Sequence, residues 1–108
     1  MRNRVQLIGN LGAQPDVKSF NETGKVARVS LATNEKYKNN KGELVTETTW
    51  HNLVLWNKQA ENAEKFFKKG SEVAIEGKIV NRTYEDKDGQ KKYVHEIHVN
   101  EFVLLGSP

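Results

Sequence analysis

The sequence predicts an all-β domain: a five-stranded Greek-key barrel with one α-helix between its third and fourth strands. Five segments alternate apolar and polar residues, as strands with one buried face do. Only one segment spaces its apolar residues as an amphipathic helix does. Turn signals separate strands that we expect to pair as hairpins. The expected strands span residues 4–11, 25–33, 48–57, 71–84 and 91–105, and the expected helix spans 57–69.

The first two strands occupy the N-terminal third. Gly9 and Gly12 permit a bulge or a sharp bend at the end of the first strand. After a turn, residues 17–20 are expected to continue that strand. Their apolar positions are Val5, Leu7 and Leu11 in the first strand and Ala27, Val29 and Leu31 in the second.

The third strand carries both tryptophans of the chain. Because strand side chains alternate between two faces, Trp50 and Trp56 share one face, about 20 Å apart at ~3.3 Å per residue. This spacing spans several stacked bases and favours a surface for unpaired nucleic acid. The alternative is that both indoles pack in a second core layer. One face carries Trp50, Asn52, Val54 and Trp56, and the other carries His51, Leu53 and Leu55, of which the leucines suit the core.

Two polar connections separate the later strands. Residues 34–47 are predicted to form a long loop with Asn40-Lys41-Gly42 at its tip, and long loops in compact domains are often functional. Residues 85–91 contain the Asp-Gly pair of a second hairpin. Three strands, one helix and two strands, with long loops at these places, are the layout of the OB barrel.

The single helix has recognisable end signals. Asn57 suits the N-cap, and Gly70 suits the left-handed position that ends helices. Lysines in the last turn complement the negative end of the helix dipole. We expect a narrow apolar stripe made of Ala60, Ala63, Phe66 and Phe67, and a basic end made of Lys65, Lys68 and Lys69. In the fourth strand, Val73, Ile75 and Ile79 are predicted to share one face.

Length and composition exclude several classes of protein. The 108 residues suit one domain with one core, which we place at 1–105 with a short end at 106–108. Seventeen Lys and Arg against fourteen Asp and Glu leave a net charge of +3, compatible with a polyanion partner. No cysteine is present, so disulfides and Cys-containing metal sites are excluded. Without a signal-peptide-like start or a long apolar run, we expect an intracellular protein and no membrane partner.

No constellation of residues suggests catalysis or metal binding. His95 and His98 are three apart in a strand and point to opposite faces, so they cannot share an ion. Acidic residues around Asp88-Gly89 are typical turn chemistry. No Gly-rich phosphate loop ending in Lys-Ser/Thr occurs. We therefore expect no enzyme, no metal and no cofactor.

Aromatic residues with cations nearby carry the functional signal. Such pairs suit base stacking combined with phosphate attraction. Taken singly, Lys58 and Lys69 are also explained as solvated charges. The pairs are Tyr37 among Lys36, Lys38 and Lys41, Tyr84 on the face of Lys78 and Arg82, and Trp56 with Lys58 two residues later.

Four blocks resemble one family. The stretch VQLIGNLG at residues 5–12, followed by Pro15, resembles the opening of bacterial single-stranded DNA-binding protein, the SSB family. TWHNLV at 49–54 resembles its central strand, and residues 67–78 resemble its helix-to-strand segment. Arg82-Thr83-Tyr84 with Asp88-Gly89 is similar to its next hairpin. The blocks follow the family's order over nearly the whole chain.

The resemblance implies an OB fold, a homotetramer, and DNA wound over the subunits without sequence readout. Tyrosine stands at 37 and 84 where Trp is common, and Trp stands at 56 where Phe is common, so an aromatic face remains at each position. His51 matches a residue near a subunit contact. The stacking residues implied are Tyr37, Trp50, Trp56 and Tyr84, and the phosphate-contacting residues are Arg4, Lys58, Lys69 and Arg82.

We therefore expect a cytoplasmic, nucleoid-associated protein that binds and protects single-stranded DNA in replication, recombination and repair. The family commonly continues into a Gly/Pro/Gln-rich tail with an acidic tip. The sequence given ends at Pro108, either because a longer protein was trimmed or because this is a short form, so it gives no support for tail-mediated replication or repair partners. Two alternatives remain open: a dimeric, primosome-type relative that acts in replication restart, and an OB barrel whose aromatics bind a protein partner or a sugar.

Overall fold

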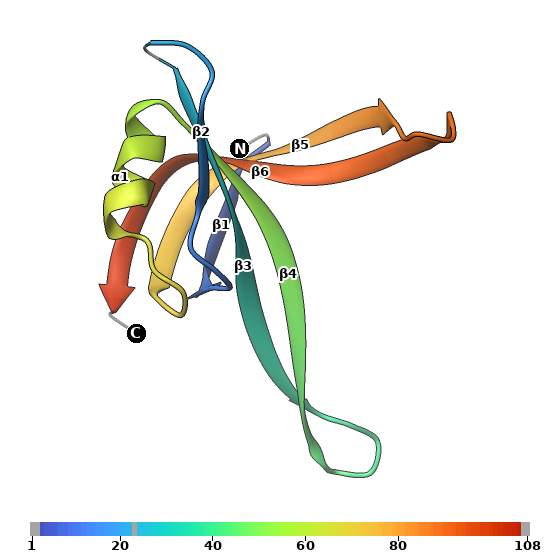
Figure 1. Cartoon of the computed structure of the whole chain (residues 1–108). Coiled ribbons are helices and arrows are strands. Elements are labelled where there is room, and N and C mark those ends of the chain that lie inside the picture. Colours follow the sequence, from blue (N-terminus) through green and yellow to red (C-terminus); the bar gives the residue numbers. More distant parts are fainter. Residues whose placement is uncertain (1–2, 23, 107–108) are drawn as a thin grey trace.

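The computed structural model describes residues 3–22 and 24–106, which form six strands and one helix (Figure 1). The long strands and the helix follow the predicted order. In chain order the elements are β1 (Val5–Leu11), β2 (Asp16–Ser19), β3 (Lys25–Lys38), β4 (Leu44–Trp56), α1 (Lys58–Phe66), β5 (Glu72–Glu85) and β6 (Lys91–Gly106). The short end expected at 106–108 begins inside β6, and residues 107–108 lie outside the described part of the chain.

Five strands close into a barrel in the order β1-β5-β6-β4-β3, because β1 also pairs with β3 where Leu11 faces Leu31. The short β2 pairs with the same edge of β3 further along, so it continues the first strand as predicted. A parallel pairing of Leu53 with Ile97 joins β4 to β6. Helix α1 lies between β4 and β5. The prediction of an OB-type Greek-key barrel is confirmed.

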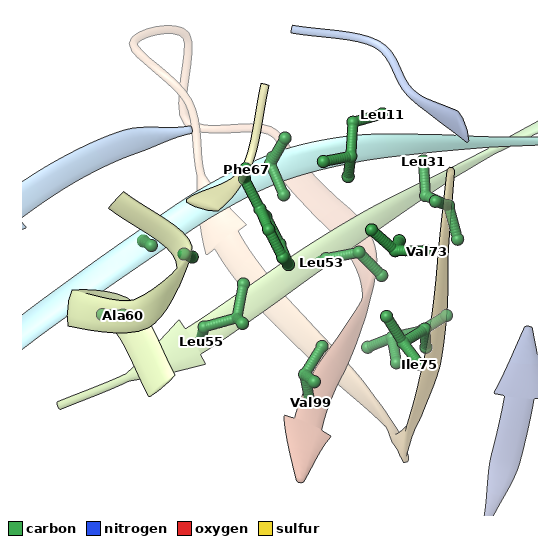
Figure 2. Close-up of a cluster of buried hydrophobic side chains, with 13 residues drawn as sticks. Leu11, Leu31, Leu53, Leu55, Ala60, Phe67, Val73, Ile75 and Val99 are labelled. Atoms are coloured by element: carbon green, nitrogen blue, oxygen red, sulfur yellow. The ribbon is translucent and has the colours of Figure 1, made fainter. Parts of the chain in front are cut away.

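The core lies inside the barrel and beneath α1 (Figure 2). Leu53 and Leu55, the predicted core residues of the tryptophan strand, are almost wholly buried. The ring of Phe67 packs edge-on against Phe102 with the centroids 4.7 Å apart. Side chains of this size each stabilise the fold by roughly 1.5–3 kcal/mol when removed from water. Barrel closure and helix packing therefore depend on one shared apolar cluster.

The prediction of a long loop over residues 34–47 is wrong, because most of these residues belong to β3 and β4. Pairing of β3 with β4 continues outward to Lys38 opposite Leu44, which leaves only residues 39–43 as the turn. The side chain of Asn39 accepts hydrogen bonds from the N–H groups of Lys41 and Glu43, and Gly42 has φ 79°. This hairpin arm projects away from the barrel, so it buries little and lacks the apolar alternation that marks a strand (Figure 1).

The helix is shorter than the predicted 57–69 at its C-terminal end. It ends at Phe66, and Phe67 turns into extended backbone with its ring in the core. Phe66, predicted in the apolar stripe, is 53% exposed. Lys68 and Lys69 consequently lie in the turn beyond the helix, which Gly70 completes with φ 90°. Two adjacent phenylalanines cannot both face one core from a single helical face, and the turn decides which one does.

Asn57 precedes the helix as predicted but does not cap it with its side chain. It has φ 52°, and its Oδ1 accepts a hydrogen bond from the N–H of Lys25 at 3.2 Å instead. The side chain therefore links the start of the helix to the start of β3.

The predicted hairpin of the last two strands is confirmed, with Glu85 opposite Lys91. Asp86 Oδ1 accepts hydrogen bonds from two turn N–H groups, and Gly89 has φ 79°. Ile79, expected on the face of Val73 and Ile75, is 47% exposed, and it lies two residues beyond Gly77, where the pairing of β5 with β1 ends.

Candidate nucleic-acid interface

Both tryptophans project from one face of β4 and remain accessible. Trp50 is 61% exposed and Trp56 is 41% exposed. In the register of the sheet they lie opposite Ala32 and Val26 of β3. The alternative that they pack in a second core layer is therefore wrong, and two indole faces are available to a flat ligand.

The indole of Trp50 lies over a glycine. A Cβ atom added at Gly12 would come within 2.6 Å of Trp50 Cζ3 and of Ser30 Oγ. Gly12, predicted as a bend, thus also makes room for the ring. A side chain there would move the indole out of its position.

The indole of Trp56 lies between two other rings. Phe20 meets it edge-on with the ring centroids 6.1 Å apart, and His98 lies at the same centroid distance with its plane tilted by 60°. These contacts orient Trp56, while it keeps an accessible surface. Phe20 was not among the residues predicted for the site.

Arg28 lies on β3 between the positions of the two tryptophans. Its register partner on β4 is Val54, which follows Trp50 by four residues and precedes Trp56 by two. Around it is a concavity of about 360 Å³. Val54 shares the face of the tryptophans but is only 1% exposed. The concavity is lined by residues that include Arg28, Asn52, Val54, Arg82 and Glu96.

Glu96 joins two arginines from different hairpins. Its Oε2 lies 2.5 Å from Nη1 of Arg28 and 3.3 Å from Nη2 of Arg82. The side chain of Glu96 is 4% exposed, whereas those of the arginines are about half exposed. Burial raises the pKa of the Glu96 carboxyl, but the hydrogen bonds from Arg28 and Arg82 outweigh it, so the pKa lies below its usual value. Glu96 is therefore ionised at neutral pH.

Tyr84 belongs to the same face. The guanidinium of Arg82 lies 5.7 Å from the centroid of its ring, which is a cation–π distance. Tyr84 is 45% exposed. The structure thus connects three predicted residues, Trp56, Arg82 and Tyr84, through His98 and Glu96, since His98 Nε2 lies 3.5 Å from Glu96 Oε1.

Tyr37 is not brought to the tryptophans. It lies on the projecting part of β3 opposite Val45, and Val45 and Trp50 are on alternate faces of the hairpin because they are five positions apart, an odd number. Tyr37 is 48% exposed. It is accessible, but from the other side of the β3–β4 hairpin.

The remaining predicted cations lie around the barrel rather than in the concavity. Arg4 Nη2 lies 2.8 Å from Glu76 Oε1. Lys58, at the start of α1, is 79% exposed and lies 3.9 Å from Glu61. Lys69 is exposed in the turn between α1 and β5. Lys58 is the one of these three that lies close in sequence to a tryptophan.

His51 faces away from the tryptophans, as predicted. Its Nε2 lies 3.0 Å from Thr33 Oγ1, and the residue is half-buried. Within the described residues, no group of three or more His, Asp or Glu is placed to hold a metal ion. No helix in the described ranges is long and apolar enough to cross a membrane.

Four residues of this surface were missed by sequence reasoning: Phe20, Arg28, Glu96 and His98. Arg28 and Glu96 are 68 positions apart in the sequence. They come within reach of each other only because their strands, β3 and β6, flank the same strand, β4, in the sheet. The sequence signal that could have indicated Arg28 is strand alternation. Ala27 and Val29 on either side of it face the core, so Arg28 faces away from the core.

An OB barrel with accessible aromatic rings and arginines on one open face defines a nucleic-acid-binding protein of the stacking type. Comparison with known proteins supplies the family. The sequence matches the single-strand binding protein family over residues 2–105, and the chain belongs to that family. A similar solved structure is the Plasmodium falciparum SSB in complex with single-stranded DNA. It is 34% identical in sequence, with a TM-score of 0.86 over 98% of this chain and 96% of the other.

Proposed function

We propose that this chain binds and protects single-stranded DNA without reading its sequence. Bases stack on Trp50, Trp56 and Tyr84, and Arg82 and Lys58 attract the phosphates. The observation that carries the proposal is the pair of exposed indoles on one face of β4, with an arginine-lined concavity between them. Family membership and the similarity to an SSB bound to single-stranded DNA support it.

Tyr37, Arg4 and Lys69 extend this surface to other sides of the barrel. Because Tyr37 lies on the alternate face of the β3–β4 hairpin, it takes bases from a strand that passes around the hairpin rather than along the tryptophan face. Arg4 and Lys69 contact phosphates of the same wrapped strand. Such a path needs a long DNA segment, so short oligonucleotides depend on the tryptophan face alone.

The protein acts as a homotetramer in this proposal. Support comes from an apolar row on the outer face of the sheet, where Ile8 pairs with Ala74 and Ala74 pairs with Val103. Ile8 is 62% exposed and Val103 is 60% exposed, and apolar rows of this kind mark contacts between chains. His51 contributes to a subunit contact on the face away from the tryptophans. A native mass measurement distinguishes the tetramer from the dimer that a primosome-type relative would form.

The cellular role follows from the activity. Coating of unpaired strands serves replication, recombination and repair in the cytoplasm at the nucleoid, and it needs no catalytic group.

A fluorescence titration with oligo(dT) at two salt concentrations tests the binding. Stacking on Trp50 and Trp56 quenches the tryptophan emission, and the affinity falls as salt rises because bound phosphates release counterions. An aromatic patch that serves only as a protein-binding surface gives no quenching at either salt concentration.

A further inference from the structure

One carboxylate oxygen holds two cations side by side in the concavity between the tryptophans. Oε2 of Glu96 contacts both the Nη1 of Arg28 and the Nη2 of Arg82. A guanidinium has five N–H donors, and a single oxygen satisfies only a part of them. The arginine side chains are 47% and 48% exposed, so the remaining donors are accessible from solvent.

The charge of this cluster suits an anion. Two guanidinium groups and one carboxylate leave one net positive charge at the concavity. Planar guanidinium groups bind phosphate oxygens in a bidentate manner, which makes arginine the preferred phosphate ligand. Glu96 cannot itself be the ligand of an incoming cation, because its side chain is 4% exposed beneath the arginines.

The cluster lies where a bound strand must pass. Arg28 pairs with Val54, and Val54 lies between Trp50 and Trp56 on β4. A strand with one base on each indole spans roughly 20 Å at strand spacing, so its backbone crosses the concavity. Each nucleotide of that backbone carries one phosphate.

We propose that Arg28 and Arg82 together form a single phosphodiester-binding subsite between the two tryptophans, and that Glu96 is the positioning residue that holds both guanidinium groups in place. This inference rests on the proposed binding of single-stranded DNA and deepens it by adding Arg28 and Glu96. Glu96 offsets the repulsion between the two adjacent cations. Through His98, whose ring packs against Trp56, Glu96 also connects the subsite to a stacking residue.

The salt dependence of oligo(dT) binding tests the subsite. Each phosphate contact on a single strand contributes about 0.7 to the slope of log affinity against log salt. Arg28→Gln is expected to flatten the slope by ~0.7. Lys65→Gln, which removes one charge from α1 outside the concavity, is expected to leave the slope unchanged. Equal slopes for Arg28→Gln and Lys65→Gln would overturn the subsite.

A double variant tests whether the two arginines share one phosphate. If they do, Arg28→Gln/Arg82→Gln flattens the slope no more than either single variant, about 0.7 in total. Additive losses would show two independent contacts and would refute the shared subsite. Removing both arginines leaves the buried Glu96 carboxylate without these two partners, so a urea denaturation curve first establishes conditions in which the double variant is folded.

Glu96→Gln tests the positioning role by the sign of its effect. The substitution adds one net positive charge, so a purely electrostatic contribution predicts tighter binding and a steeper slope. Positioning predicts the reverse: weaker binding, a flatter slope, and little further effect of Arg28→Gln in the same background. If Glu96→Gln does not fold, the arginine double variant still decides the proposal.

Trp50→Ala serves as the reference for the proposed function. One outcome would reject the subsite and leave the stacking surface in place. Trp50→Ala would bind oligo(dT) more weakly with an unchanged salt slope, and Arg28→Gln would bind with the affinity and salt slope of the unmodified protein. If oligo(dT) neither quenches the tryptophan emission of the unmodified protein nor binds it in a salt-dependent way, DNA binding itself is rejected.

Discussion

Glu96 on β6 accepts a hydrogen bond from Arg28 on β3, although β4 lies between these strands in the sheet. The pair therefore crosses β4 obliquely, because Arg28 is level with Val54, whose partner on β6 is His98, two residues after Glu96. This crossing accounts for the burial of Val54 on a face that is otherwise open. It also ties the β3–β4 hairpin to the β5–β6 hairpin by a charged contact.

Glu96 makes the stability of the protein depend on pH in the acidic range. Its folded-state pKa lies below the usual 4.5, so its ionised form stabilises the fold above that pH. This stabilisation is lost as pH falls from 4.5 through the folded-state pKa. The free energy of unfolding, measured by urea denaturation, should fall more on acidification for the unmodified protein than for Glu96→Gln.

The matched control is Glu76→Gln, which removes a carboxyl whose pKa is also lowered, by a hydrogen bond from Arg4. That ion pair is more solvent-exposed, so screening leaves it a smaller contribution. If the free energy of unfolding falls with pH in the same way for the unmodified protein and for Glu96→Gln, the acid-range pH dependence does not come from Glu96.

Removal of both indoles should weaken DNA binding most clearly at high salt, where stacking persists and phosphate attraction fades. Each lost stacking partner is expected to cost about 1–3 kcal/mol in Trp50→Ala/Trp56→Ala. Because this variant has no tryptophan emission, its affinity is measured by the anisotropy of labelled oligo(dT). Phe66→Ala removes an exposed aromatic from α1 and is the control that should bind normally. Unchanged affinity of the double variant rules out the stacking surface.

Gly12→Ala should weaken DNA binding through the position of Trp50. The added Cβ would lie 2.6 Å from Cζ3 of the indole, so the ring must move. The ring is the far end of an exposed side chain, and the fold should tolerate the shift. Weaker oligo(dT) binding with a nearly unchanged urea midpoint is the expected result, and normal binding would show that the indole adapts.

Lys58→Ala should chiefly flatten the salt dependence. Its side chain is 79% exposed and lies two residues after Trp56, so in the proposed complex it would neutralise a phosphate, and its removal costs no packing. We expect a slope change of about 0.7 and little change in stability. Lys65→Ala, two helical turns away, controls for net charge. A loss of affinity that is equal at all salt concentrations would speak against a phosphate contact.

Phe67→Ala should destabilise the barrel by about 3–5 kcal/mol, because it removes a ring that is 1% exposed and packs against Phe102. The neighbouring Phe66→Ala should stay within ~0.5 kcal/mol, since its ring is half exposed. Urea denaturation of the two variants compares adjacent positions of identical residue type. Equal destabilisation would contradict the observed end of α1.

Local periodicity was sufficient for much of the fold. The alternation around Leu53 and Leu55 identified the core face of the middle strand, and the same alternation put Trp50 and Trp56 together on the other face. The turns at Gly42 and Gly89 were readable because Gly takes a positive φ without strain. Where β3 and β4 leave the barrel, as at Tyr37, no core imposes alternation, and the sequence pattern predicted a loop in place of strand.

The sequence by itself determined which residues alternate, where the turns lie and which aromatic rings share a strand, because these properties depend on neighbours a few positions away. Only the tertiary structure decided that Phe67 rather than Phe66 enters the core, that Tyr37 lies on the far face of its hairpin, and that Arg28 meets Glu96. Those outcomes depend on which strands become neighbours when the barrel closes, and on side chains up to 68 positions apart that strand alternation cannot relate.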